Sequence, residues 1–148
     1  MIKILFVCHG NICRSPMAEF VLRDLITGSA HPQSIQIASA ATSTEEIGNP
    51  VHPKTTAILR RHGISTEGKY ARQMIRQDYD DYDYLIGMDS RNIRNMLRIT
   101  GGDPQHKICR LLDFTDRPGD IADPWYTGDF ETTYADILRG CQALSARL

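Results

Sequence analysis

A cysteine and an arginine near the start of the chain have the spacing that an attack on phosphorus requires. Cys8 and Arg14 enclose a short loop, and Ser15 follows the arginine. A thiolate can act as a nucleophile, and an arginine guanidinium can bind two phosphate oxygens at once. The backbone N–H groups of the loop and the N-terminus of a following helix favour a bound dianion. These residues together predict a site for phosphoryl transfer.

The residues of this loop also have expected structural tasks. The N–H groups of residues 9–14 would bind the equatorial oxygens of the transferring phosphoryl group. Gly10 would let the loop curl without a Cβ clash, and Asn11 would tolerate a left-handed backbone conformation. Ser15 would donate a hydrogen bond to the sulfur, and the positive surroundings would favour the thiolate near neutral pH. Taken alone, the same spacing also fits a buried structural cysteine and a solvated arginine.

A leaving phenolate needs a proton, and the segment 113–128 carries carboxylates that could supply it. This segment is rich in Asp, Pro and Gly, too polar for the core and long enough for a functional loop. Composition alone does not choose among its candidate acids, which are Asp116, Asp120 and Asp123. Trp125 and Tyr126 would either wall the cleft and stack on a substrate ring or anchor the loop on the protein surface.

The elements that must position these residues follow from the apolar pattern. Strand-length apolar runs alternate with helix-period segments, which predicts a small doubly wound α/β fold, with about four parallel strands and helices on both faces. The expected strands span Ile2–Val7, Ser34–Ala38, Tyr84–Met88 and Lys107–Leu112. The expected helices span Pro16–Thr27, Pro53–His62, Asp89–Arg98 and Asp129–Arg147. Ligands bind beyond the carboxyl ends of such strands, so Cys8, Ser39 and Asp123 should converge on one crevice.

The overall composition limits the classes of function. The 148 residues are 41% hydrophobic, which predicts one domain over residues 1–148 with a substantial core. The 17 basic and 18 acidic residues, without a long Lys/Arg run, argue against nucleic acid as a partner. The chain shows neither a signal-like leader nor an apolar stretch of membrane-spanning length, so we expect a cytoplasmic protein without a membrane partner.

The four cysteines argue against metal binding and structural disulfides. Cys8, Cys13, Cys109 and Cys141 form no CxxC pair and have no metal-ligand spacing with the five histidines. Neither a metal nor another cofactor is therefore expected. Cys109 lies in an apolar strand-like run and Cys141 on the apolar face of a helix, so both should belong to the core.

Several blocks of the sequence resemble the low molecular weight protein tyrosine phosphatase family. They run in the family's order over nearly the whole chain: Cys8–Glu19, Ser39–Ser43, Glu46–Pro50, Arg61–Ile64, Ala71–Gln73, Met88–Asp89 and Asp123–Tyr126. The resemblance implies a metal-independent phosphatase that hydrolyses phosphotyrosine in proteins, and aryl phosphates, through a phosphocysteine intermediate. Inorganic phosphate would be its product.

The resemblance also assigns roles to individual residues. It makes Cys8 the nucleophile, Arg14 the phosphate clamp and Asp123 the general acid. The residues that bind phosphate or support the loop would be His9, Gly10, Asn11, Ile12, Cys13, Ser15 and Ser39. The substrate cleft would be lined by Glu45, Asn49, Trp125 and Tyr126. A reversible disulfide between Cys8 and Cys13, protecting the nucleophile, is implied as well.

Three positions depart from the family pattern. Many members carry a histidine of the loop-supporting network where this chain has Lys69, which we expect to be a solvated surface lysine. This leaves open how the network is completed. The family often has an apolar residue at the position of His9 and an aromatic residue at that of Glu45, so the rim of the site should be more polar here.

Three other functions compete with phosphotyrosine hydrolysis. The nearest is a protein arginine phosphatase of the same family, whose members carry threonine at the position of Ile12. The branched apolar side chain of Ile12 would instead pack against the phenyl ring of a phosphotyrosine. Arsenate reductase needs further cysteines poised beside the loop, and Cys109 and Cys141 lie in apolar contexts. A non-catalytic phosphate-binding module would not require both Cys8 and Asp123.

Overall fold

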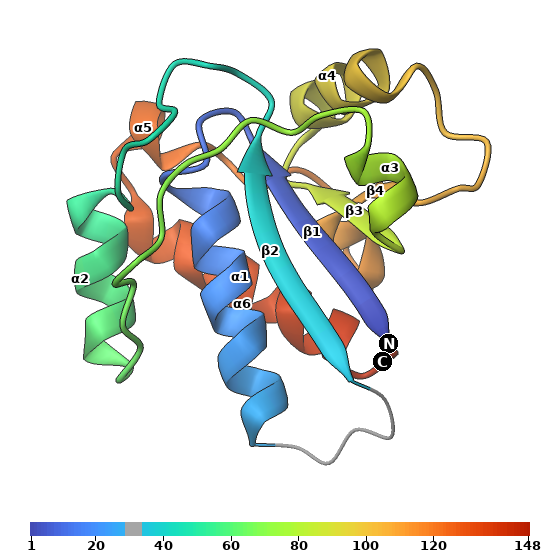
Figure 1. Ribbon diagram of the computed structural model, residues 1–148. Helices are drawn as coiled ribbons and strands as arrows, with labels where there is room; N and C mark the ends of the chain where they lie inside the picture. Colours follow the sequence, from blue (N-terminus) through green and yellow to red (C-terminus); the bar gives the residue numbers. More distant parts are fainter. Residues whose placement is uncertain (29–33) are drawn as a thin grey trace.

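The protein is built around a parallel β-sheet, seen in the computed structural model, which describes residues 1–28 and 34–148 (Figure 1). The four strands lie in the order β2-β1-β3-β4. They are β1 (Ile2–Cys8), β2 (Ile35–Ala41), β3 (Tyr84–Gly87) and β4 (Ile108–Arg110). All three pairings are parallel. The predicted α/β fold class is therefore confirmed.

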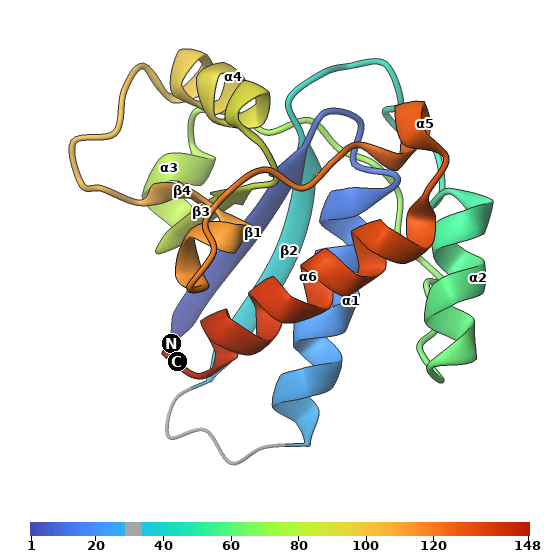
Figure 2. The same ribbon diagram turned by 180° about the vertical axis from the view of Figure 1, so that it is seen from behind.

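Helices cover both faces of the sheet. They are α1 (Arg14–Thr27), α2 (Pro53–Arg61), α3 (Asp78–Asp81), α4 (Ser90–Thr100), α5 (Pro124–Thr127) and α6 (Phe130–Ser145), with a 3-10 turn η1 at Leu111–Phe114. Figures 1 and 2 show α1, α2 and α6 on one side of the sheet and α3 and α4 on the other. Within the part of the chain that the structure describes, none of these helices has the length and apolarity needed to cross a bilayer.

The central strand β1 is buried on both faces. Ile4, Phe6 and Cys8 belong to the core cluster on the side of α1 and α6. Leu5 and Val7 belong to the cluster on the side of α3 and α4. Because successive side chains of a strand point to opposite faces, a strand covered on both sides has a continuous apolar sequence. The same alternation brings the Cys8 side chain to the α1 side at the carboxyl end of the strand.

Two glycines allow close packing of elements near this end of the sheet. A Cβ at Gly140 of α6 would lie 2.5 Å from Cγ of Leu111, so α6 packs closely on η1 only because this residue lacks a side chain. A Cβ at Gly87 of β3 would lie 3.0 Å from side-chain atoms of Ile93 and Met96 on α4. These contacts fix α4 and α6, which flank the segments carrying Asp89 and Asp123.

The strand boundaries differ from the sequence prediction where pairing or turn chemistry decides them. Strand β2 runs to Ala41 because Ala41 is in register with Cys8 of β1. Strand β4 ends at Arg110 because Asp113 Oδ2 accepts a hydrogen bond from the Arg110 N–H and the chain turns into η1. The predicted fourth strand, Lys107–Leu112, is therefore too long at both ends.

Two short helices were not predicted. Helix α3 has only four residues, too few to show a helical period. Helix α5 lies inside the segment expected to be a loop, where Asp123 caps it by accepting a hydrogen bond from the Trp125 N–H and Pro124 occupies its first turn. Helix α1 begins at Arg14 rather than Pro16, because proline is tolerated within the first turn.

Candidate active site

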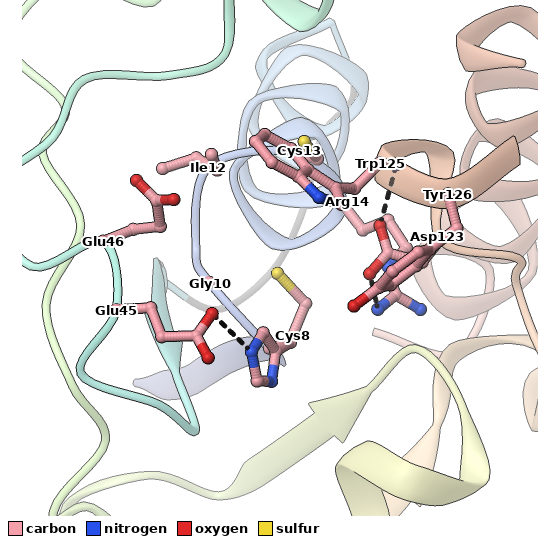
Figure 3. Close-up of a pocket in the computed structure, with 11 residues that line it drawn as sticks. Cys8, Gly10, Ile12, Cys13, Arg14, Glu45, Glu46, Asp123, Trp125 and Tyr126 are labelled. Carbon is pink, nitrogen blue, oxygen red and sulfur yellow. Dashed lines mark hydrogen bonds and ion pairs between the residues drawn. The ribbon is translucent and has the colours of Figure 1, made fainter. Parts of the chain in front are cut away.

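The loop after β1 wraps around the sulfur of Cys8 (Figure 3). This sulfur lies 3.3 Å from the Asn11 backbone nitrogen and 3.4 Å from that of Ser15, and both N–H groups donate to it. The Ser15 Oγ lies 3.0 Å from the same sulfur. Because Cys8 is only 3% exposed, these three groups take the place of water around the sulfur.

Asn11 holds the loop in an unusual backbone conformation. Its φ is 58°, in the left-handed region that the sequence analysis anticipated for this residue. The buried side-chain amide donates to Ser15 Oγ at 2.7 Å and to Ser39 Oγ at 2.9 Å. Its Oδ1 accepts from the Arg72 N–H at 3.2 Å, which fixes the orientation of the amide. Every polar atom of the Asn11 side chain thus serves to hold the loop.

Gly10 avoids a close Cβ contact, and the neighbour concerned lies outside the loop. The left-handed turn of the loop lies at Asn11, whereas Gly10 has no positive φ. A Cβ at Gly10 would lie 3.3 Å from Cγ of Glu46, on the chain that follows β2. The missing side chain therefore leaves room for Glu46 beside the loop.

The hydrogen bonds beneath the loop have a fixed direction. Glu19 is a carboxylate and can only accept, so the Ser39 hydroxyl donates to it at 2.6 Å. The Ser39 oxygen is then free to accept from Asn11, which also donates to Ser15. This leaves the Ser15 hydrogen for the Cys8 sulfur at 3.0 Å, with the Ala40 carbonyl at 3.4 Å as the longer alternative.

Lys69 completes this network, so the expectation that it is a solvated surface lysine was wrong. Its side chain is 15% exposed, and Nζ lies 3.3 Å from Oε1 of Glu19. Nζ also donates to the Ser39 carbonyl at 3.0 Å. Burial lowers the pKa of Lys69, an effect that the charge of Glu19 opposes. The lysine thus occupies the far end of a chain of contacts that runs through Glu19, Ser39 and Asn11 to the loop.

Arg14 is fixed by acceptors on three sides. Its side chain is 2% exposed, and Nη1 donates to Asp89 at 2.6 Å and to the Ile121 carbonyl at 2.9 Å. Nη2 donates to Asp123 at 3.3 Å. Burial by itself would lower the pKa of Arg14, but the negative charges of Cys8, Asp123 and Asp89 outweigh it and raise the pKa. The guanidinium therefore stays charged inside the protein.

The geometry distinguishes Asp123 from the other two candidate acids. Asp123 faces the cavity over Cys8 (Figure 3), whereas Asp116 is exposed at a distance from it. Asp120 accepts hydrogen bonds from Arg110 and from Ser90. Its burial acts to raise the pKa, but these hydrogen bonds outweigh burial and lower it, which makes Asp120 a poor proton donor.

The structure brings most of the predicted site residues around one cavity, which we call the Cys8 cavity. Its lining includes Cys8, His9, Gly10, Ile12, Cys13, Arg14, Glu45, Asp123, Trp125 and Tyr126. Asn11, Ser15 and Ser39 lie beneath the loop instead and support it. Asn49 was expected to line the cavity but does not. Its Nδ2 donates to Glu46, which lines the cavity.

Trp125 and Tyr126 form an exposed wall of the Cys8 cavity. They are 59% and 77% exposed, so neither is buried as a loop anchor. Trp125 has one edge-to-face contact, with the His52 ring at a centroid distance of 6.0 Å. Their exposed faces are available for stacking on a substrate ring.

The remaining cysteines differ in their access to the cavity. Cys13 lines it, and burial, together with the nearby charge of Cys8, raises the pKa of its thiol to about 12. Cys141 is fully buried in the core, as expected. Cys109 is half-buried and packs against the core, and burial also raises its pKa to about 12. Among the residues described, no group of three His, Cys, Asp or Glu side chains is arranged to hold a metal ion.

Sequence reasoning missed three acids that serve the site, Glu19, Glu46 and Asp89. Glu19 gave a signal, because it is a charged residue inside the apolar part of α1. Asp89 was expected only as the first residue of the helix Asp89–Arg98. It caps α4 through Oδ1, which accepts from the Asn92 N–H, while Oδ2 holds Arg14.

The family of the chain follows from comparison with known proteins. The family model described as "Low molecular weight phosphotyrosine protein phosphatase" matches residues 3–148. The chain belongs to this family. The low molecular weight protein-tyrosine-phosphatase YfkJ of Bacillus subtilis is 46% identical over 150 residues, covering 100% of this chain and 96% of that protein. The low molecular weight phosphotyrosine protein phosphatase of Gallus gallus is 42% identical, covering 95% and 92%.

Solved structures of the family share the fold. The crystal structure of YfkJ from Bacillus subtilis matches with a TM-score of 0.95, covering 99% of this chain and 94% of that one. A structure of DARP, the Drosophila arginine phosphatase, matches with a TM-score of 0.89 at 28% identity, covering 99% and 97%. Since both proteins have the same fold, the fold alone does not distinguish the phosphorylated residue.

Proposed function

We propose that this phosphatase hydrolyses phosphotyrosine in proteins through a phosphocysteine intermediate. One observation carries the proposal: the Cys8 sulfur, the Arg14 guanidinium and the Asp123 carboxylate meet in the same cavity. A binding module has no use for a buried thiolate and a proton donor side by side. The 46% identity to YfkJ supports phosphotyrosine as the substrate class.

Substrate binding would begin with the phosphate dianion. The loop N–H groups and Arg14 would bind its equatorial oxygens, since the loop and Arg14 line the same cavity as Cys8. In the free enzyme, Nη2 of Arg14 is engaged by Asp123 at 3.3 Å. A bound phosphoryl group would take over this donor and leave the Asp123 carboxyl free to face the leaving oxygen.

Cys8, Asp123 and one water molecule supply the groups that the two chemical steps need. The Cys8 thiolate attacks phosphorus in line, the P–O bond to tyrosine breaks, and Asp123 gives its proton to the departing phenolate. Ser15 stabilises the sulfur as nucleophile and later as leaving group, through its contact at 3.0 Å. Asp123, now a carboxylate, takes a proton from the water that attacks the phosphocysteine. The P–S bond breaks, and inorganic phosphate and the Cys8 thiolate are released.

Arginine is the principal alternative to tyrosine as the phosphorylated residue. Ile12 lines the Cys8 cavity and is 8% exposed, so an apolar side chain borders the bound phosphoryl group. This favours the phenyl ring of tyrosine over a guanidinium, which needs polar partners when it is desolvated. For arsenate reduction, the half-buried Cys109 and the buried Cys141 are poorly placed, since neither lines the cavity.

The test is steady-state turnover of a phosphotyrosine peptide and of phosphoarginine by the same preparation. We expect kcat/KM to be much higher for the peptide. Rapid quenching with a denaturant at alkaline pH should also trap phosphate on Cys8, because unfolding removes the groups that hydrolyse the phosphocysteine. A higher kcat/KM for phosphoarginine would overturn tyrosine as the substrate while leaving the cysteine mechanism in place.

A further inference from the structure

Two depressions adjoin beside the Cys8 loop, and their outer walls carry opposite charges. The first is the Cys8 cavity, whose outer wall includes Glu45 and Glu46. We call the second the α4 groove, because Arg91 and Arg94 of α4 line it. Both depressions share the four residues His9, Arg14, Asp123 and Tyr126. In Figure 1 the chain that follows β2, which carries the two glutamates, and α4 lie on opposite sides of the carboxyl end of β1.

Two acidic side chains, Glu45 and Glu46, form the outer wall of the Cys8 cavity. Glu45 is 68% exposed and contacts Nε2 of His9 at 3.0 Å. Glu46 accepts from the neutral amide of Asn49 at 2.5 Å. Within residues 1–28 and 34–148, no lysine or arginine forms an ion pair with either glutamate. Figure 3 shows both carboxylates on the same side of the cavity, facing Asp123 and Tyr126 across it.

The α4 groove has the opposite character. Arg91 and Arg94 are both exposed, and neither guanidinium group forms a hydrogen bond or ion pair with the other residues described. The acids of the groove are already engaged, since Asp89 holds Arg14 and Asp120 pairs with Arg110. The two free guanidinium groups are thus available to a carboxylate or phosphate of a ligand.

We infer that the enzyme selects phosphotyrosine in a dipolar sequence context, with a basic residue on one side of the phosphotyrosine and an acidic residue on the other. The inference rests on the proposed function, since it describes the peptide around the tyrosine held over Cys8. The basic side chain would lie against Glu45 and Glu46, and the acidic one against Arg91 and Arg94. Exposed charge pairs contribute little individually, so each should change kcat/KM by about two- to fivefold.

Peptides of identical composition test the inference. One carries lysines before the phosphotyrosine and glutamates after it, the second has the reverse order, and a third is flanked by alanine on both sides. Because the peptide can lie across the site in only one productive direction, one of the two charged isomers should exceed both other peptides in kcat/KM. The advantage should shrink as salt is added, since these charges are exposed to solvent.

Variants then assign the effect to the two walls. The double variant Glu45→Gln and Glu46→Gln should remove the advantage that the lysines give. The double variant Arg91→Gln and Arg94→Gln should remove the advantage that the glutamates give. Each rate is divided by that of free phosphotyrosine with the same variant, so that changes in basal catalysis cancel. Glu67→Gln and Arg98→Gln each remove one charge of the corresponding sign outside both depressions and should leave the preference intact.

The possible outcomes separate this inference from the proposed function. Equal kcat/KM values for the three peptides, or an advantage that persists in both double variants, would refute the dipolar preference while phosphotyrosine hydrolysis stands. Failure to hydrolyse every phosphotyrosine peptide, with turnover of phosphoarginine, would refute the proposed function and this inference with it. A preferred isomer that loses part of its advantage in each double variant would establish both the proposed function and the dipolar preference.

Discussion

Nζ of Lys69 lies 3.3 Å from Oε1 of Glu19, and neither side chain is more than 15% exposed. The pair lies at the end of the network that supports the Cys8 loop. It keeps Glu19 as the acceptor from Ser39 and so sets the direction of the hydrogen bonds that reach Asn11. The lysine therefore acts through other residues, as a positioning residue.

We expect Lys69→Met to lower kcat about tenfold with little change in KM, because the loop loses its fixed hydrogen-bond direction while the phosphate-binding groups remain. Lys69→Arg, which keeps the charge, should restore much of the activity. The measurement is steady-state kinetics with an aryl phosphate. An equal rise of KM in both variants would instead indicate a general loosening of the site.

The lowered pKa of Lys69 gives its pH dependence a definite sign. Between this lowered value and the ordinary value of 10.5, the folded state binds fewer protons at Lys69 than the unfolded state does. The contribution of this group to the free energy of unfolding therefore rises with pH in that window. The free energy of unfolding of the wild type, relative to that of Lys69→Met, should therefore rise with pH in this window. Over the same window kcat should fall, because the deprotonated lysine no longer forms an ion pair with Glu19. Urea unfolding and kinetics across the same pH range measure both.

Cys8→Ser should abolish turnover while leaving the binding of a phosphate analogue largely intact. The hydroxyl is a poor nucleophile, but the Arg14 guanidinium and the loop N–H groups remain in place. Titration with inorganic phosphate followed by calorimetry, alongside an aryl phosphatase assay, makes the comparison. More than a few per cent of wild-type activity in Cys8→Ser would contradict the covalent mechanism. Arg14→Ala should weaken both binding and turnover.

Asp123→Asn should slow the release of poor leaving groups far more than that of good ones. Loss of a general acid costs about a hundredfold or more when the departing group is a tyrosine phenolate, and much less for an activated nitrophenolate. A series of aryl phosphates with graded leaving-group acidity measures the difference. Asp120→Asn is the matched control, since Asp120 is held by Arg110 and Ser90. Equal losses across the series would move the acid away from Asp123.

Cys13 should protect the nucleophile against irreversible oxidation. Peroxide would oxidise the Cys8 thiolate to a sulfenic acid, and the Cys13 thiol would displace water from it to form a disulfide. Activity lost in mild peroxide should return with dithiothreitol in the wild type and fail to return in Cys13→Ser. Peptide mapping before reduction should find the Cys8–Cys13 crosslink, and its absence would leave Cys13 with a packing role.

Ile12→Thr should shift the ratio of kcat/KM values toward phosphoarginine and away from phosphotyrosine. The smaller hydroxyl-bearing side chain provides space and a polar partner beside the phosphoryl group. Ile12→Val is the matched control, because it reduces volume without adding polarity. If both variants shift the ratio equally, the size of the side chain rather than its polarity decides the specificity.

Local patterns were sufficient to predict the sheet and the loop. The continuous apolar run of β1 and the spacing from Cys8 to Arg14 are properties of adjacent residues, and both predictions match the structure. Asn11 also has the predicted left-handed backbone. These features could be inferred because each depends on residue type and short spacing.

Long-range partners could not be inferred in this way. Lys69 lies in a polar stretch of sequence that is typical of the surface, and only the fold brings it to Glu19. The place of Glu46 beside Gly10 likewise depends on how the chain after β2 crosses the loop. The neighbours of Asp89 placed it at the start of a helix, whereas its contact with Arg14 joins distant parts of the chain.

Because side chains alternate along β1, the position of Cys8 in the strand decides toward which face of the sheet its sulfur points. Cys8 shares its face with Ile4 and Phe6, so one residue inserted into or deleted from the strand would turn the sulfur toward α4 or expel the two core side chains. Two inserted residues would keep the face but move the sulfur about 7 Å along the strand, away from Arg14. The length of this strand is thus fixed by the chemistry at its end as firmly as by the core around it.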